Sequence, residues 1–137
     1  MTTTRTFFTR IALPLFAFLT LALALTVAPR TARAEATAAS ATSKACTSVE
    51  NRLPVGESTK FKKGDRIFVW SEIKGAEGQS VEHVWKKDGT ELRRARFNVT
   101  SGNWHTNSRV PSAAAGSYVV DVVMGDKVIG SVSFTVE

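Results

Sequence analysis

The sequence contains one cysteine and two histidines in 137 residues. A single cysteine excludes an intramolecular disulfide, so the fold depends on its apolar core. Neither histidine is spaced from Cys46 or from the other histidine as metal ligands are, so we expect no metal site and no cofactor. Phosphate-binding glycine loops and Ser-His-Asp arrangements are not recognisable. The sequence therefore contains no motif that indicates an enzyme.

Acidic residues are missing from residues 1–34, where two arginines precede a mostly apolar run over residues 11–28. This order is typical of a signal peptide. Small residues at Ala32 and Ala34, and again at Ala34 and Ala36, predict cleavage after Ala34 or after Ala36. We therefore expect an exported protein of the periplasm or the extracellular space. The alternative is a membrane anchor formed by residues 11–28, a run near the shortest length that spans a bilayer.

The formal net charge of +6 depends on this N-terminal segment. Residues 1–34 hold four of the 18 basic residues, so 14 basic residues remain against 12 acidic ones, a net charge of +2 over 103 residues. This balance is typical of a mixed-sign surface rather than a nucleic-acid-binding one. We expect no nucleic-acid partner, and membrane contact only if the signal segment is retained.

The remaining sequence divides into two parts. Residues 35–44 carry no large apolar side chain that could offset the entropy of ordering them, which predicts a flexible leader. Residues 45–137 consist of short apolar and β-branched runs separated by turn residues, with no sustained helical period. Within them, residues 81–87 alternate between two faces, and Asp88-Gly89 predicts a tight hairpin turn. This length fits one domain.

About seven or eight strands with short connections favour an all-β, antiparallel immunoglobulin-like sandwich. A small closed barrel is the alternative. The residues that alternation directs inward form the expected core: Ile67, Val69, Trp85, Phe97, Val99, Trp104, Tyr118, Val120, Val122, Val132, Phe134 and Val136.

A series of landmarks then resembles, in order, the bacterial family called domain of unknown function 2914. They are Asn51-Arg52-Leu53-Pro54-Val55, Phe61, Gly64-Asp65-Arg66-Ile67-Phe68, Ser71-Glu72-Ile73, His83-Val84-Trp85, Asp88-Gly89, Trp104-His105-Thr106-Asn107-Ser108, Gly116-Ser117-Tyr118-Val119-Val120 and Phe134-Thr135-Val136. The resemblance spans about residues 46–137. It implies a compact β-domain at the C-terminal end of bacterial envelope proteins, with no assigned activity and no catalytic positions to carry over. The family usually has another basic residue at His105 and Trp at Tyr118, so a ligand surface there would differ.

Five residues are candidates for binding. Trp70 and Trp104 could offer indole faces to a sugar ring, and His105 lies on the strand face opposite Trp104. Arg94 and Arg96 share a strand face and could meet an acidic partner. The alternatives are that the indoles belong to the core and that the arginines protect a strand edge from aggregation.

We therefore expect a non-enzymatic binding or structural module of the cell envelope that contacts a protein or a glycan. The alternative is a small hydrolase or metal-dependent enzyme that uses His83 or His105. A histidine on an apolar strand face is more often structural, and we expect this of His83. Cys46, which has no partner within the chain, is expected to be an inert thiol.

Overall fold

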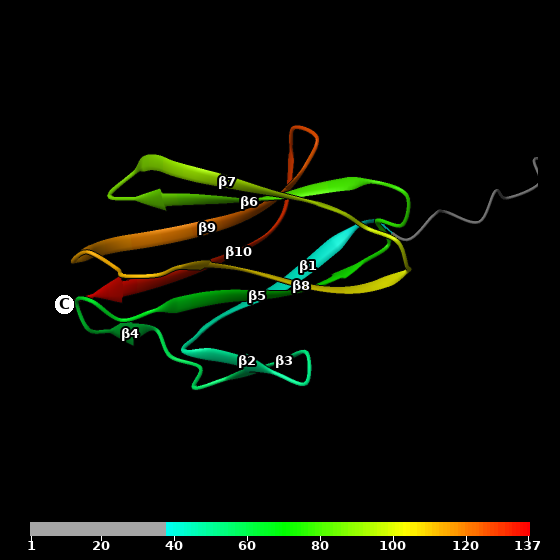
Figure 1. The fold of residues 1–137 in the computed structure, drawn as a ribbon. Helices are drawn as coiled ribbons and strands as arrows, with labels where there is room; N and C mark the ends of the chain where they lie inside the picture. Colours follow the sequence, from blue (N-terminus) through cyan, green and yellow to red (C-terminus); the bar gives the residue numbers. More distant parts are fainter. Residues whose placement is uncertain (1–37) are drawn as a thin grey trace, which may run out of the picture. The chain divides into compact units, whose positions relative to one another are not determined.

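The computed structural model describes residues 38–137, which form an all-β domain (Figure 1). Its strands are β1 (Ser40–Cys46), β2 (Ser48–Glu50), β3 (Leu53–Val55), β4 (Lys60–Phe61), β5 (Ile67–Lys74), β6 (Ser80–Lys87), β7 (Thr90–Asn98), β8 (Asn103–Val110), β9 (Gly116–Met124) and β10 (Lys127–Val136). These residues include no helix long and apolar enough to cross a membrane. The predicted signal peptide and the beginning of the predicted leader lie outside the described residues.

The strands form two facing sheets and a separate hairpin. One sheet has the order β1-β5-β8, the other has the order β4-β10-β9-β6-β7, and β2 pairs with β3. Every pairing is antiparallel except the short parallel pairing of β4 with β10. This arrangement confirms the predicted immunoglobulin-like sandwich. The structure has more strands than the predicted seven or eight. The additional strands are the short β2, β3 and β4, of two or three residues each, around Pro54 and Gly56.

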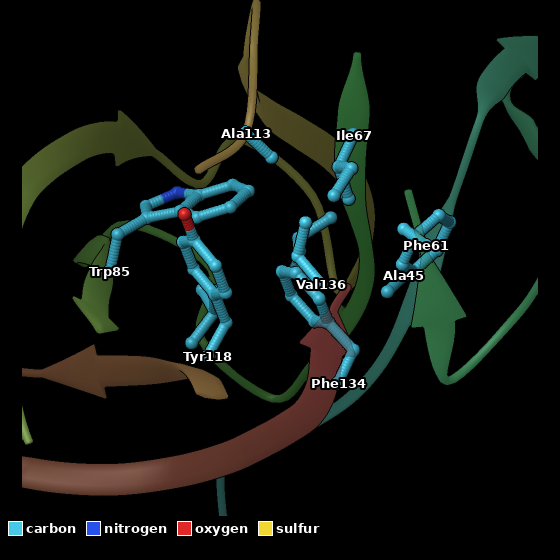
Figure 2. Packing of buried hydrophobic residues seen from close by; sticks show 10 residues of the cluster. Ala45, Phe61, Ile67, Trp85, Ala113, Tyr118, Phe134 and Val136 are labelled. Atoms are coloured by element: carbon cyan, nitrogen blue, oxygen red, sulfur yellow. The ribbon is translucent and has the colours of Figure 1, made fainter. Parts of the chain in front are cut away.

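The main core lies between the two sheets. One cluster of buried apolar residues contains Ile67 and Val69 of β5 together with Trp85 of β6 and Phe134 of β10. Figure 2 shows Trp85, Tyr118 and Phe134 directed into this shared space from different strands. All twelve predicted core residues are buried or pack partly buried against the core. The alternation in the sequence therefore identified the inward faces correctly.

Tyr118, near the start of β9, forms a hydrogen bond to the segment that connects β8 to β9. Its ring is stacked on Phe134, with centroids 5.1 Å apart, and its hydroxyl donates a 2.8 Å hydrogen bond to the carbonyl of Ala114. A tyrosine near the start of this strand that bonds back to the backbone a few residues upstream is a recurring feature of immunoglobulin-like domains. Since Tyr118 is only 2% exposed, it belongs to the core and not to a ligand surface.

The hairpin turn predicted at Asp88-Gly89 is present, and two further two-residue turns accompany it. Asp88 and Gly89 have φ values of 50° and 82° and connect β6 directly to β7, as a two-residue turn with positive φ angles requires. Gly125, with φ 66°, begins the turn between β9 and β10. A third two-residue turn, not predicted, connects β2 to β3 through Asn51 and Arg52.

The structure differs from the sequence prediction at the start of the domain. Residues 40–44, expected to belong to a flexible leader, form most of β1 and pair with β5. Large side chains are unnecessary here because the strand is held by backbone hydrogen bonds and by close packing. Ser43 shares a 2.7 Å hydroxyl hydrogen bond with Ser71, and a Cβ atom built on Gly130 would lie 2.8 Å from Ala41 Cβ.

Candidate functional site

A pocket of about 260 Å³ lies where the β2–β3 hairpin covers the outer face of the three-stranded sheet. The loop that precedes β8 forms its third side. The pocket is lined by Val49, Arg52, Trp70, Ser101, Asn103, Trp104, His105, Thr106 and Asn107. Three of the five predicted binding residues, Trp70, Trp104 and His105, therefore converge on one site.

Strand pairing brings Trp70 and His105 together. In the ladder between β5 and β8, Trp70 is opposite Asn107 and Glu72 is opposite His105. Alternation directs these residues away from the core, because their neighbours Val69 and Ile73 are fully buried on the inner face. The rings of Trp70 and His105 are stacked at 5.4 Å with an interplanar angle of 24°.

Trp70 is fixed by the hairpin above it. Its Nε1 donates a 2.7 Å hydrogen bond to the carbonyl oxygen of Arg52, at the tip of the β2–β3 turn. Only 6% of its surface is exposed. The indole therefore forms a rigid wall behind His105 rather than the open platform that the sequence analysis considered.

His105 is the more accessible aromatic ring of the stacked pair. Its side chain is 31% exposed, and its Nε2 lies 3.7 Å from a carboxylate oxygen of Glu72. Lys74 approaches the same carboxylate at 3.5 Å. A side-chain hydrogen bond from Asn103, with smaller contributions from Lys74 and His105, lowers the pKa of Glu72. Glu72 is thus an ionised carboxylate that lies beside the imidazole.

Trp104 belongs to both the core and the pocket. It is partly buried and packs against the second apolar cluster, which contains Ile73 and Val122. Its Nε1 is enclosed without a hydrogen-bond partner in the described part of the chain. Because of this packing, a substitution of Trp104 would change stability as well as the pocket.

Arg94 and Arg96 lie elsewhere, on β7 of the five-stranded sheet. Arg94 forms a bidentate pair with Glu91 at 2.7 and 3.0 Å and also contacts Glu82 at 3.0 Å. Arg96 donates two hydrogen bonds to Glu82 at 2.6 and 2.9 Å. These hydrogen bonds lower the pKa values of Glu82 and Glu91 and raise the pKa of Arg94. Two carboxylates thus balance the two arginines on this exposed strand.

His83 is in the interior, as expected of a structural residue. It is fully buried, and its Nδ1 lies 2.7 Å from Ser108 Oγ. The same hydroxyl accepts a 2.8 Å hydrogen bond from Trp85 Nε1, so this polar cluster connects β8 of one sheet to β6 of the other. Burial lowers the pKa of His83 to about 4. The hydrogen-bond partner of His83 is a side-chain hydroxyl.

Cys46 is also buried, and burial is the main cause that raises the pKa of its thiol. Since thiolates are the reactive form of cysteine, this environment suits an unreactive side chain. Among residues 38–137, no group of three or more His, Cys, Asp or Glu side chains is placed to hold a metal ion.

Sequence reasoning missed the residues that complete the pocket, above all Arg52, Asn103 and Asn107. The signal that could have indicated the β2–β3 turn is Asn51, because Asn favours turns with positive φ. The placement of this turn over β5 is a tertiary contact that no local pattern specifies. Three other hollows, of about 330, 410 and 400 Å³, each contain at most one of the five predicted binding residues.

The fold and the pocket together describe a concave surface on the outer face of an immunoglobulin-like domain. Residues 78–136 match the model of a family described as "Protein of unknown function (DUF2914)", which confirms the predicted resemblance over β6 to β10. A search of curated proteins found no match. The matched segment includes Trp104 and His105, whereas Arg52 and Trp70 lie before it.

Proposed function

We propose that this protein is an exported, non-enzymatic binding module of the bacterial cell envelope that contacts a glycan through the pocket under the β2–β3 hairpin. Of the two partner classes that the sequence suggested, a protein or a glycan, the pocket favours the glycan. A concave site with an aromatic wall and a few polar groups suits a sugar ring, which has an apolar face and a polar edge.

The convergence of Trp70, Trp104 and His105 with Arg52 in one pocket is the observation that carries this proposal. These residues come from two strands and a hairpin turn that are distant in the sequence. The stacked Trp70 and His105 rings and the bond from Trp70 to the hairpin hold the pocket in shape before a ligand arrives. Such preorganisation reduces the entropic cost of binding.

Binding is better supported than the enzymatic alternative that used His83 or His105. Ser108 and His83 are within hydrogen-bond distance, as a nucleophile and base would be, but they are 7% and 0% exposed. His105 is accessible, and its ring contacts Trp70 and Glu72. Of the hydroxyls that line the same pocket, that of Ser101 donates its hydrogen bond to the carbonyl of Asn103, and that of Thr106 is largely buried.

The proposal is tested by sedimentation with insoluble peptidoglycan sacculi. The full chain, expressed in a bacterium with its own N-terminal segment, should sediment with sacculi, and His105→Ala should reduce the bound fraction at least fivefold. His105 is half-exposed, so this variant should keep the melting temperature within a few degrees.

Arg109→Ala is the matched control, because Arg109 is on the same strand and face but lies over Phe68, outside the pocket. It should sediment like the unmodified chain. Arg94→Ala should do the same, since Arg94 is paired with Glu82 and Glu91 on the other sheet. Equal sedimentation of the His105→Ala variant and the unmodified chain would remove the pocket from the proposal.

A further inference from the structure

Arg52 occupies a backbone conformation that side chains rarely adopt. It follows Asn51 in the two-residue turn between β2 and β3. The φ value is 50° at Asn51 and 64° at Arg52. Glycine is the preferred residue at the second position of such a turn. Non-glycine residues held at positive φ are concentrated at binding and active sites, where the surrounding structure maintains them. Here the hydrogen bond from Trp70 Nε1 to the carbonyl oxygen of Arg52 maintains the conformation of the turn.

Arg52 lines the pocket, and its guanidinium has no ion-pair or hydrogen-bond partner within residues 38–137. Among the other arginines of residues 38–137, Arg94 and Arg96 pair with glutamates and Arg93 pairs with the carbonyl of Arg109. The exposed Arg66 is also unpaired within these residues, but it lies outside the pocket. An arginine that is kept at a strained turn position and left unpaired has a planar fork of donors available for a carboxylate.

The rest of the lining is consistent with an anion. No acidic residue lines the pocket, and its other polar side chains are those of Ser101, Asn103, His105, Thr106 and Asn107. The carboxylate of Glu72, beside His105, is already engaged by Lys74 and Asn103. Glu72 is therefore not available to neutralise Arg52.

The size of the pocket limits what it can hold. Its volume of about 260 Å³ is slightly below the roughly 300–1,000 Å³ typical of small-molecule sites. One ring with its substituents is therefore a better fit than an extended oligosaccharide. The exposed imidazole of His105, supported from behind by Trp70, is the surface on which such a ring would lie.

Building on the proposed glycan-binding function, we propose that the pocket binds a pyranose that carries a carboxylate, as a uronic acid does. The carboxylate is bound by the guanidinium of Arg52, and the sugar ring rests on His105. Arg52 thus selects an acidic sugar over a neutral one.

The experiment compares two probes that differ only in the carboxylate, methyl β-D-glucuronide and methyl β-D-glucoside. Each is titrated into the full chain, and binding is followed by the nuclear magnetic resonance shifts of the backbone amides and of the indole N–H of Trp70. We expect the glucuronide to bind at least tenfold more tightly than the glucoside and to shift the signals of Arg52, His105 and Asn107.

Arg52→Gly is the informative variant, because glycine suits φ 64° and so removes the guanidinium without straining the turn. It should keep or raise the melting temperature and lower the preference for the glucuronide from at least tenfold to about onefold. Arg66→Ala removes an equal charge from an exposed residue outside the pocket and should leave the preference unchanged.

Three results would overturn the inference. The first is equal affinity for the two probes, and the second is an unchanged preference in Arg52→Gly. The third is tighter, Arg52-dependent binding of N-acetylalanine, which would identify a peptide carboxylate as the ligand. If neither sugar shifts the pocket signals while the chain still sediments with sacculi, the acidic sugar is excluded but the proposed function stands. The loss of sedimentation as well would exclude both.

Discussion

At the scale of single residues, His83 shows how burial determines the role of a titratable group. Its ring is enclosed between the sheets, and Nδ1 is the nitrogen that contacts Ser108. Nε2 has no partner in the described structure. Protonation would place a charge in the core and leave an N–H group at Nε2 without an acceptor, so the neutral ring is strongly favoured.

This environment predicts that acid destabilises the domain through His83. The pKa is about 4 in the folded protein and 6.5 in the unfolded chain, so below pH 6.5 the unfolded state binds more protons. The free energy of unfolding should therefore decrease as the pH falls from 6.5 and level off below 4. At about 1.4 kcal/mol per pH unit, the total loss is roughly 3 kcal/mol. Urea unfolding between pH 7 and 3.5 measures it.

His83→Asn is the comparison, because it retains a polar side chain near Ser108 and does not titrate in this range. The variant is less stable at pH 7, but the difference between its stability and that of the unmodified chain should shrink as the pH falls. A difference that stays constant from pH 7 to pH 4 would show that His83 does not carry the acid sensitivity. Exposed carboxylates such as Glu91 titrate in both proteins and cancel in this comparison.

At the scale of elements, β1 depends on a glycine in a distant strand. Gly130 lies in β10, beside a register shift between Val128 and Gly130, and a Cβ atom there would overlap the backbone and side chain of Ala41. No large side chain anchors β1 at this point. The close approach of two backbones takes the place of the apolar packing that the sequence lacks.

We therefore expect Gly130→Ala to separate β1 from β10. The free energy of unfolding should fall by about 1–3 kcal/mol, the usual range for overpacking. Hydrogen exchange should show faster exchange of the β1 amides. Gly102→Ala is the control, because the nearest atom to its added Cβ would be Glu77 Oε2 at 3.9 Å, an ordinary contact. Equal stability and equal exchange in the two variants would contradict the prediction.

Sequence patterns predicted some elements and missed others for identifiable reasons. The hairpin at Asp88-Gly89 and the strands around it were predictable because their turn chemistry and alternation are local. Residues 40–44 of β1 were predicted to be flexible because their small side chains carry no local apolar signal. The pairing of Arg94 and Arg96 with Glu82 and Glu91 also follows from cross-strand register, which the sequence pattern alone did not specify.

At the scale of the whole molecule, the N-terminal segment leads to a prediction about location. When the chain is expressed in a bacterium, mass spectrometry of the exported protein should show a mature N-terminus at Glu35 or Thr37, after cleavage following Ala34 or Ala36. The protein should then be found in the periplasmic or extracellular fraction. An intact N-terminus in the membrane fraction would instead support anchoring by residues 11–28.

The sequence by itself determined the all-β class, the inward faces of the strands and the family resemblance, because alternation and turn chemistry are properties of neighbouring residues. Only the tertiary structure decided which candidates share a site. It placed Trp70, Trp104 and His105 around one pocket with Arg52, and it placed Arg94 and Arg96 on the other sheet. The reason is that strand pairing and the docking of a hairpin bring together residues separated by tens of positions, and these long-range contacts leave no local pattern in the chain.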